Sequence, residues 1–548
     1  MSFDELYESC FRNASLVKVP LGKPAKEDAS LLVTLDHVMN TSQYVVFFLT
    51  AGAKGADMSL KLDNMIRKKN EKTDKDKAHS SPARIRRFFS MKKKKKNKDG
   101  SVSGETTLIS VVLVDTDYRS SSDEGASSQL AQPGWYVYAP QLLATKSRLL
   151  RALGFEFPPS LIVVDTASRS VVTTEGRRLL ADDVNGTSFP WWPPAALEVL
   201  KGCILRRVNG AVETSDFSTI KTTVRGLLFG AQWCPPCRQW VKQLTPVYEQ
   251  MKANGISLEI VFCSSDRTQE AFDQFTAQMP WPAFSYDPSK TIALTRVYNI
   301  SGIPSLILLD PTGRVITNHG RSSLLEDPAG RYFPWGPRPL YELNEFTVCR
   351  LRDEPSLILF TEGSPDDIQF SLSVMDTVSK RLFEERIKIE ERRLEEAEKK
   401  GDENTEPGSG LSKSASSEEC SSTGSDLPIP PQADPLQLLY TGEDPICDHI
   451  LESILGLGDV ELPLICIVDG LAGHLCVCDR PDVSEAVLEE FVMEYRAGHL
   501  HWTPLPAADQ HSSKSVGGIP NAIIEQALIS NSPSQNSIGN GKEEVKAV

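Results

Sequence analysis

The 548-residue sequence has no apolar run of the ~18 residues that a membrane-spanning helix needs. Its first residues, MSFDELYESC, are acidic and contain no basic segment followed by an apolar one, so they do not resemble a secretory signal. We therefore expect a cytoplasmic and nuclear protein, in compartments where thiols stay reduced. The 11 cysteines are odd in number and irregularly spaced, which argues against a disulfide framework.

The 59 basic residues are fewer than the 73 acidic ones, and the net charge of −14 argues against nucleic acid as a general partner. The exception is Ile66 to Lys98, where 15 basic residues accompany 3 acidic ones. We interpret residues 66–104 as a basic insertion. Its central part, RIRRFFSMKKKKKNK at 84–98, leaves three alternatives open: a solvated charged loop, a nuclear-localisation signal for an import receptor, or a patch that binds anionic lipid.

Two cysteines lie three positions apart in the stretch FGAQWCPPCRQW. A structural zinc site needs a second close pair of Cys or His, and the sequence contains no other C-x-x-C, so we expect no metal. A cysteine attacks as the thiolate, and a helix N-terminus stabilises that anion. Because a buried strand ends just before Trp233 and a helical pattern follows, Cys234 is predicted at an exposed helix start, with Cys237 one turn further in. We favour a redox dithiol, with Cys234 attacking and Cys237 resolving, over a zinc site or inert thiols.

A second candidate element is SGIPSL, in which Ile303 and Pro304 lead a buried strand. An X-Pro bond at such a place can be cis, and the backbone beside it could pair with an extended substrate chain. The alternative is a trans proline that starts an edge strand. With the dithiol present we favour the cis arrangement, and we take Trp233, Ile303 and Pro304 as candidate substrate-binding residues.

One pattern occurs three times, as PSLIVVD, PSLILLD and PLICIVD at 159–165, 304–310 and 463–469. Each copy is a short apolar run typical of a buried strand, and each is followed by a turn and a second apolar segment. The first two copies also share Gly-Arg and Phe-Pro-Trp in EGRRLLADD…SFPWWP and HGRSSLLED…YFPWGP. Strands that alternate with helical patterns predict an α/β fold with internal duplication.

The residues WCPPCR, followed by strand, helix, strand and GIPSLILLD, resemble a thioredoxin-fold domain of the tryparedoxin and nucleoredoxin type. MPWPAF and FPWGP extend the resemblance to the nucleoredoxin family, over about residues 1–505. The resemblance implies three tandem thioredoxin-like domains, of which the central one is catalytic. The implied division is 1–194 without a dithiol, 195–345 with WCPPC, 346–505 without a dithiol but with a disordered linker at 401–434, and a disordered tail at 506–548.

By this resemblance the chain is a protein-disulfide reductase that binds no cofactor and receives electrons from NADPH through a separate reductase. Its implied partners are protein disulfides and Dishevelled-like proteins of Wnt signalling; the alternative is a redox-switched binding scaffold with little turnover. Leu228 stands where thioredoxins carry a buried Asp, so the proton acceptor for Cys237 is unidentified. Four other cysteines lie in apolar segments and are expected to be core residues: Cys263, Cys466, Cys476 and Cys478.

Overall fold

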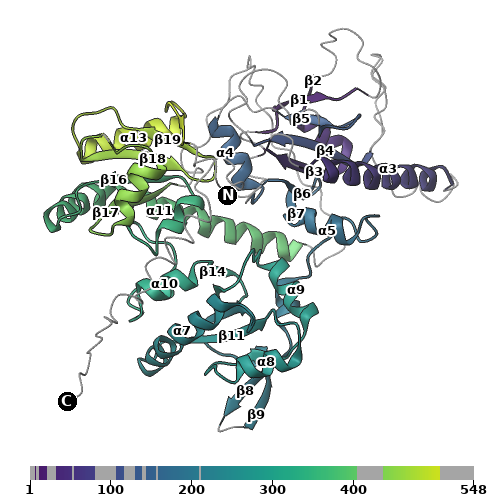
Figure 1. The fold of residues 1–548 in the computed structure, drawn as a ribbon. Helices are drawn as coiled ribbons and strands as arrows, with labels where there is room; N and C mark the ends of the chain where they lie inside the picture. Colours follow the sequence, from purple (N-terminus) through teal and green to yellow (C-terminus); the bar gives the residue numbers. More distant parts are fainter. Residues whose placement is uncertain are drawn as a thin grey trace, which may run out of the picture.

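The computed structural model contains three β-sheets, each formed by a continuous part of the chain, with helices packed around them (Figure 1). We call them the first, second and third sheets in chain order. The structure describes Tyr7 and residues 11–20, 32–51, 55–79, 107–116, 130–138, 143–155, 158–208, 211–403, 436–458 and 460–506. Within these residues no helix combines the length and the apolar character needed to cross a membrane.

The first sheet has the strand order β2-β1-β5-β4-β3-β6-β7. Strand β3, which lies between a parallel and an antiparallel neighbour, is nearly all buried. Its side chains alternate between two core clusters, one on each face of the sheet, and this explains the apolar run VVFFL. The strands are β1 Ser15–Lys18, β2 Leu32–Thr34, β3 Ser42–Thr50, β4 Thr107–Asp115, β5 Tyr136–Tyr138, β6 Ser160–Asp165 and β7 Ser170–Thr173. The helices are α2 Leu35–Thr41, α3 Ala56–His79, α4 Leu143–Ala152 and α5 Gly176–Asp182.

The second sheet has the order β14-β13-β10-β11-β12-β8-β9, and the two cysteines follow its strand β10 at the start of helix α7. Its strands are β8 Cys203–Val208, β9 Ala211–Asp216, β10 Val224–Gly230, β11 Leu258–Ser264, β12 Ala283–Phe284, β13 Ser305–Leu309 and β14 Val315–Thr317. The helices are α6 Ala196–Leu200, η5 Phe217–Thr219, α7 Pro235–Ala253, α8 Gln269–Thr276, α9 Pro288–Val297 and α10 Gly320–Glu326. This alternation of buried strands and helices is the α/β fold predicted from the sequence.

The third sheet has the order β15-β17-β16-β18-β19-β20. The 39-residue helix α11 packs against it and runs across the middle of Figure 1. The strands are β15 Tyr341–Leu343, β16 Ser356–Phe360, β17 Gln437–Thr441, β18 Leu464–Asp469, β19 His474–Val477 and β20 Thr503–Pro504. The helices are η6 Val348–Arg352, α11 Pro365–Glu403, α12 Ile446–Asp448, η7 His449–Ile454 and α13 Glu485–Ala497.

The repeated apolar pattern occupies the same place in all three sheets. In each copy a cis X-Pro bond precedes a strand (β6, β13 or β18) that pairs antiparallel with β3, β10 or β16. A turn then leads to the next antiparallel strand, which is β7, β14 or β19. The predicted strand, turn and antiparallel strand are therefore confirmed. The cis bonds are Pro158–Pro159, Ile303–Pro304 and Leu462–Pro463.

The second repeated pattern, which ends in Phe-Pro-Trp, folds around a carboxylate. The side chain of Asp327 accepts hydrogen bonds from the backbone N–H groups of Arg331 and Tyr332, at 2.9 and 2.7 Å, and from Nε1 of Trp335 at 3.0 Å. One carboxylate thus closes the turn after α10 and anchors the indole that follows. The corresponding contacts in the first sheet join Asp183 to Thr187, Ser188 and Trp191.

Gly320 begins α10 where the helix approaches strand β13. A Cβ atom at this position would lie 2.7 Å from the carbonyl oxygen of Leu306, which belongs to the rigid backbone of the strand. We expect Gly320→Ala to destabilise the protein by about 2 kcal/mol, in the upper range of single substitutions. Chemical denaturation of the full chain checks this, with Gly336→Ala as the control, since a Cβ at Gly336 has no neighbour within 4 Å. Equal midpoints for the two variants would contradict the prediction.

The basic insertion begins later than the predicted residue 66. Helix α3 continues to His79, and Ile66 is buried beside Leu62 and Met65 against the first sheet. The amide of Asn70 also binds the backbone carbonyl of Ile109 at 3.1 Å. Charge counting placed the border too early, because Ile66, a buried residue of this helix, directly precedes basic residues and the helix continues through them. Residues 84–98, residues 404–434 of the predicted linker and the predicted tail beyond 506 lie outside the described residues.

A buried ion pair joins the first sheet to the third. Arg151, at the end of α4, lies 2.7 Å from the carboxylate of Asp469, at the end of β18. Ser147 of α4 binds the same carboxylate, and the backbone N–H of Ala472 donates to its other oxygen at 3.0 Å. The side chains of the ion pair are only 11% and 6% exposed. Water is therefore almost completely excluded from both charged groups, and the ion pair fixes the part of the chain that forms the first sheet against the part that forms the third.

Candidate active site

The two cysteines of WCPPC lie where strand β10 passes into helix α7. Cys234 is the N-cap of the helix, and the backbone N–H of Cys237 points at its sulfur, 3.3 Å away. The two prolines between them occupy the first helical turn, where a missing N–H costs little. Cys234 and Cys237 form a disulfide, with their Cα atoms 5.3 Å apart. The arrangement can therefore alternate between a dithiol and a disulfide with little movement of the backbone.

Cys234 is less accessible than expected. It is 5% exposed and Cys237 is 1% exposed, so the predicted order of exposure is right but the predicted exposed position of Cys234 is wrong. The reason lies in the loop before β13: the carbonyl oxygen of Ile303 is 4.0 Å from the Cys234 sulfur. This loop covers the sulfur, and it belongs to a part of the chain far outside the WCPPC motif.

The loop that covers Cys234 also contains the second predicted element. The Ile303–Pro304 peptide bond is cis, as expected from the sequence, and β13 begins at the next residue. The structure therefore brings Cys234, Ile303 and Pro304 together. The backbone of this loop lies beside the sulfur that a substrate has to reach.

Trp233 extends the same surface. Its side chain is 51% exposed, which is high for an indole, while its Nε1 donates to the carbonyl of Ser265 at 3.1 Å. The guanidinium of Arg267 lies 5.6 Å from the ring centroid. Trp233 thus presents a fixed aromatic face next to the dithiol.

Asp266 is a supporting residue that the sequence analysis missed. It is 5% exposed, and its carboxylate accepts from the backbone N–H of Gln232 at 2.7 Å and from the hydroxyl of Ser264 at 2.8 Å. It therefore ties the loop before Cys234 to the end of β11. The signal for it was the Ser-Ser-Asp that follows the buried strand, a typical position for a side chain that binds neighbouring backbone.

Glu259, a buried carboxylate on β11, does not lie beside Cys237. Leu228, at the position where thioredoxins carry Asp, is 1% exposed. Glu259 is buried on β11, but it pairs in register with Arg225, three residues before Leu228 and so about 10 Å along the strand. Its carboxylate binds the hydroxyl of Tyr248 at 2.7 Å and a guanidinium nitrogen of Arg206 at 2.9 Å. Glu259 is therefore committed to other partners.

The remaining predicted core cysteines are buried, as expected. Burial raises the pKa of the Cys476 thiol to about 11, so it is protonated at neutral pH. Burial likewise raises the thiol pKa in the other three, Cys263, Cys466 and Cys478. The described residues contain no group of three or more His, Cys, Asp or Glu side chains placed to hold a metal ion.

Two family models match the chain. Residues 222–315, which include the dithiol and the cis proline, match the thioredoxin-like family model. Residues 337–499, which include the third sheet except its last strand β20, match the model of the thioredoxin-like C-terminal domain. Both matches agree with the α/β architecture seen around the second and third sheets.

Curated relatives extend the similarity beyond single domains. The chain is 33% identical to nucleoredoxin from Danio rerio over 349 residues, which are 63% of this chain and 72% of that protein. It is 32% identical to nucleoredoxin from Xenopus laevis over 373 residues, 68% of this chain and 79% of that protein. A shorter stretch is 35% identical to tryparedoxin from Trypanosoma brucei brucei, over 20% of this chain and 76% of that protein. The chain belongs to the nucleoredoxin family of thioredoxin-like redox oxidoreductases.

Proposed function

We propose that the chain is a protein-disulfide reductase that acts through Cys234 and Cys237. The observation that supports this most directly is the position of Cys234 at the start of α7, where the Cys237 N–H faces its sulfur. Helix N-termini favour the thiolate over the thiol, and the thiolate is the attacking form.

The reaction has two exchange steps. The Cys234 thiolate attacks one sulfur of a client disulfide, forms a mixed disulfide and releases the first client thiolate, which takes a proton from solvent. Cys237 then gives its thiol proton to solvent and attacks the Cys234 sulfur as the thiolate. This closes the disulfide between the two cysteines and releases the second client thiolate, which takes up a proton. Two electrons pass from the dithiol to the client. The short Cα–Cα distance of 5.3 Å allows the second step without rearrangement of the helix.

Substrate binding would use the surface around the sulfur. A client chain that lies extended beside Ile303 and Pro304 can hydrogen-bond to their backbone, which places its disulfide over Cys234. The exposed ring of Trp233 offers apolar contact to the residues that flank the client cysteine. Backbone pairing of this kind recognises extended protein segments with little dependence on their sequence.

The proposal extends to domains, partners and location. We assign three tandem thioredoxin-like domains, with residues 195–345 as the catalytic one. Support comes from the three sheets, each of which contains a strand (β3, β10 or β16) with one parallel and one antiparallel neighbour.

NADPH would supply electrons through a separate reductase. Family resemblance points to Dishevelled-like signalling proteins as partners and to the cytoplasm and nucleus as locations. Residues 84–98 would serve an import receptor or anionic lipid, and the net charge of −14 disfavours nucleic acid.

Turnover of a model protein disulfide tests the enzymatic function. We expect the full chain, supplied with a dithiol reductant, to accelerate reduction of insulin disulfides. The double variant Cys234→Ser/Cys237→Ser should lose this acceleration by a factor of ~10³ or more, as expected when a nucleophile is removed. Turbidity of the released insulin chains measures the rate. Equal rates for the wild type and the double variant would refute a reductase.

A redox-switched scaffold is the second candidate. It is favoured by one observation: the segments after β3 and β16, which correspond to the WCPPC segment after β10, contain no cysteine. Such modules can bind partners without exchange chemistry. Partner binding that survives the double cysteine variant would support the scaffold, and binding that disappears with it would exclude a scaffold independent of the dithiol.

A further inference from the structure

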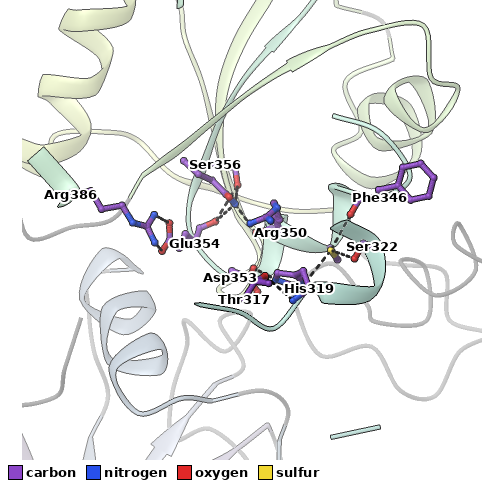
Figure 2. Close-up of polar contacts among 11 residues, drawn as sticks. Thr317, His319, Ser322, Phe346, Arg350, Asp353, Glu354, Ser356 and Arg386 are labelled. Atoms are coloured by element: carbon purple, nitrogen blue, oxygen red, sulfur yellow. Dashed lines mark hydrogen bonds and ion pairs between the residues drawn. The ribbon is translucent and has the colours of Figure 1, made fainter. Parts of the chain in front are cut away.

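Cys349 belongs to a cluster that the proposed reductase does not use. Its sulfur lies 3.4 Å from Nδ1 of His319, and Nε2 of the same ring lies 2.5 Å from the carboxylate of Asp353. The imidazole therefore lies between the thiol and the carboxylate, and Figure 2 shows His319 beside Asp353, with a dashed line from the ring to a sulfur atom. This is the order of groups in sites where a base activates a cysteine and a third group orients the base.

The cluster is assembled from two parts of the chain. His319 precedes α10 in the part that forms the second sheet, and its backbone N–H donates to the hydroxyl of Thr317 at 3.1 Å. Cys349 lies in η6, between strands β15 and β16 of the third sheet, and Asp353 directly follows η6. The guanidinium of Arg350 stacks 4.3 Å from the ring centroid of Tyr341 and so fixes this short helix. A backbone hydrogen bond of His319 and the side chain of Arg350 therefore hold the two halves of the cluster.

The charges around the thiol favour its ionised form. Burial by itself would raise the pKa of Cys349, but the charge of His319 and its hydrogen bond to the sulfur outweigh burial and lower that pKa, with Arg350 assisting and Asp353 opposing. Burial by itself would lower the pKa of His319, but the charges of Cys349 and Asp353 and their hydrogen bonds raise it well above the ordinary value. By contrast, burial raises the pKa of the Cys447 thiol to about 12.

The cluster faces a cleft of about 630 Å³, within the range of ~300–1,000 Å³ usual for small-molecule sites. Cys349, His319 and Asp353 line it together with Pro304 and Pro236 of the dithiol surface. Three arginines also line the cleft, and one of them is the buried partner of Asp469: Arg151, Arg321 and Arg352. Asp353 is the carboxylate among the described lining residues, and it is bound to the imidazole. The three guanidinium groups, each of which also has a partner within the protein, outnumber the carboxylates among the described lining residues, and guanidinium groups recognise carboxylates.

We propose that Cys349 is a second thiol–disulfide exchange site, which takes a carboxylate-bearing low-molecular-weight disulfide, represented by glutathione disulfide, in this cleft. The Cys349 thiolate attacks one sulfur, a new S–S bond forms to Cys349, and the S–S bond of the compound breaks. The leaving thiolate takes a proton from the imidazolium of His319. Cys349 is oxidised to the mixed disulfide, and half of the compound is reduced to its thiol.

The mixed disulfide at Cys349 is a stored modification rather than an intermediate. Among the described residues, the partners of the Cys349 sulfur are the imidazole of His319, the hydroxyl of Ser322 at 3.8 Å and the carbonyl of Phe346 at 3.5 Å. None of these groups is a thiol that could resolve the bond. The site therefore differs in outcome from the dithiol, whose second cysteine is one turn away.

The experiment uses the full chain with Cys234→Ser/Cys237→Ser, so that exchange by the dithiol contributes nothing. The protein is incubated with glutathione disulfide between pH 5.5 and 8.5, and modification of each cysteine is followed by peptide mass spectrometry. Cys203, exposed on β8 with its sulfur near the carbonyl of Ile204, is the internal control. At pH 6.5 we expect Cys349 to react about fivefold faster than Cys203 or more. A Cys349 rate no higher than that of Cys203 would overturn the proposal.

Variants separate activation from accessibility. His319→Gln should slow Cys349 about fivefold and move its pH dependence upward, toward that of an ordinary thiol with a pKa of ~8.5. His499→Gln, the same substitution at an exposed histidine outside the cluster, should leave rate and profile unchanged. An unaltered profile in His319→Gln would refute activation by the imidazole. Cystamine, a cationic disulfide, should react more slowly than glutathione disulfide, and equal rates would refute selection of carboxylates.

Discussion

Cys237→Ser is expected to trap client proteins on Cys234 as mixed disulfides, whereas Cys234→Ser captures none. The asymmetry follows from the geometry of α7: Cys234 occupies the helix start, and Cys237 lies one turn further in and is almost completely buried. Without Cys237 the first exchange step still occurs, but nothing attacks the Cys234 sulfur to release the client. The difference in captured protein should exceed about a hundredfold, because a serine hydroxyl does not form disulfides.

Non-reducing gels and mass spectrometry of trapped complexes measure this outcome. The double variant is the matched control, because it retains the fold of the loop while it lacks both sulfurs. Equal capture by the two single variants would mean that either cysteine can attack, and the assignment of roles would be wrong. Capture by neither would mean that clients do not reach the dithiol, and the reductase proposal would fall.

Asp469→Ala should detach the first sheet from the third. The substitution leaves the guanidinium of Arg151, 11% exposed, without this carboxylate, and removal of one partner of a buried pair costs about 3–5 kcal/mol. Asp376→Ala breaks the exposed pair with Lys380, whose side chains are 57% and 62% exposed, and should cost less than about 1 kcal/mol. Denaturation and limited proteolysis of the full chain compare the two. Similar stability of both variants would show that the buried pair does not hold the sheets together.

The ion pair between Arg151 and Asp469 should also make the contact between the first and third sheets sensitive to acid. Burial tends to raise the pKa of Asp469, but the charge of Arg151 and the hydrogen bond from Ser147 outweigh it and hold that pKa below the ordinary value of ~3.9. A depressed carboxyl pKa contributes stability above the unfolded value and loses it as the pH falls through the folded value. The contact should therefore remain intact at neutral pH and weaken only below about pH 4. Asp469→Asn should abolish this acid dependence, and an unchanged acid transition would contradict the assignment.

The dithiol and the cis proline were predictable because their signals are local. Two cysteines beside prolines mark a helix start within a few residues, and a proline before an apolar run marks the loop that ends in Pro304. The burial of Cys234 was not predictable in this way. It depends on Ile303, which lies 69 positions away in the chain and meets the sulfur only in the folded state.

The cluster at Cys349 had no sequence signal for the same reason. His319 and Cys349 are 30 positions apart and belong to parts of the chain that form different sheets, so no spacing rule connects them. The error at residue 66 differs, because the signal was present. Leu62, Met65 and Ile66 follow helical spacing and pack in the core, but the count of basic residues outweighed that pattern.

Because His319 activates Cys349, the reactivity of this thiol depends on the distance between the parts of the chain that form the second and third sheets. Any movement that parts the second sheet from the third has to withdraw the imidazole from the sulfur, since each comes from a different side. The alkylation rate of Cys349 then reports on the separation of these two parts of the chain. A partner that separates the two parts should lower this rate, and a partner that holds them together should keep it high.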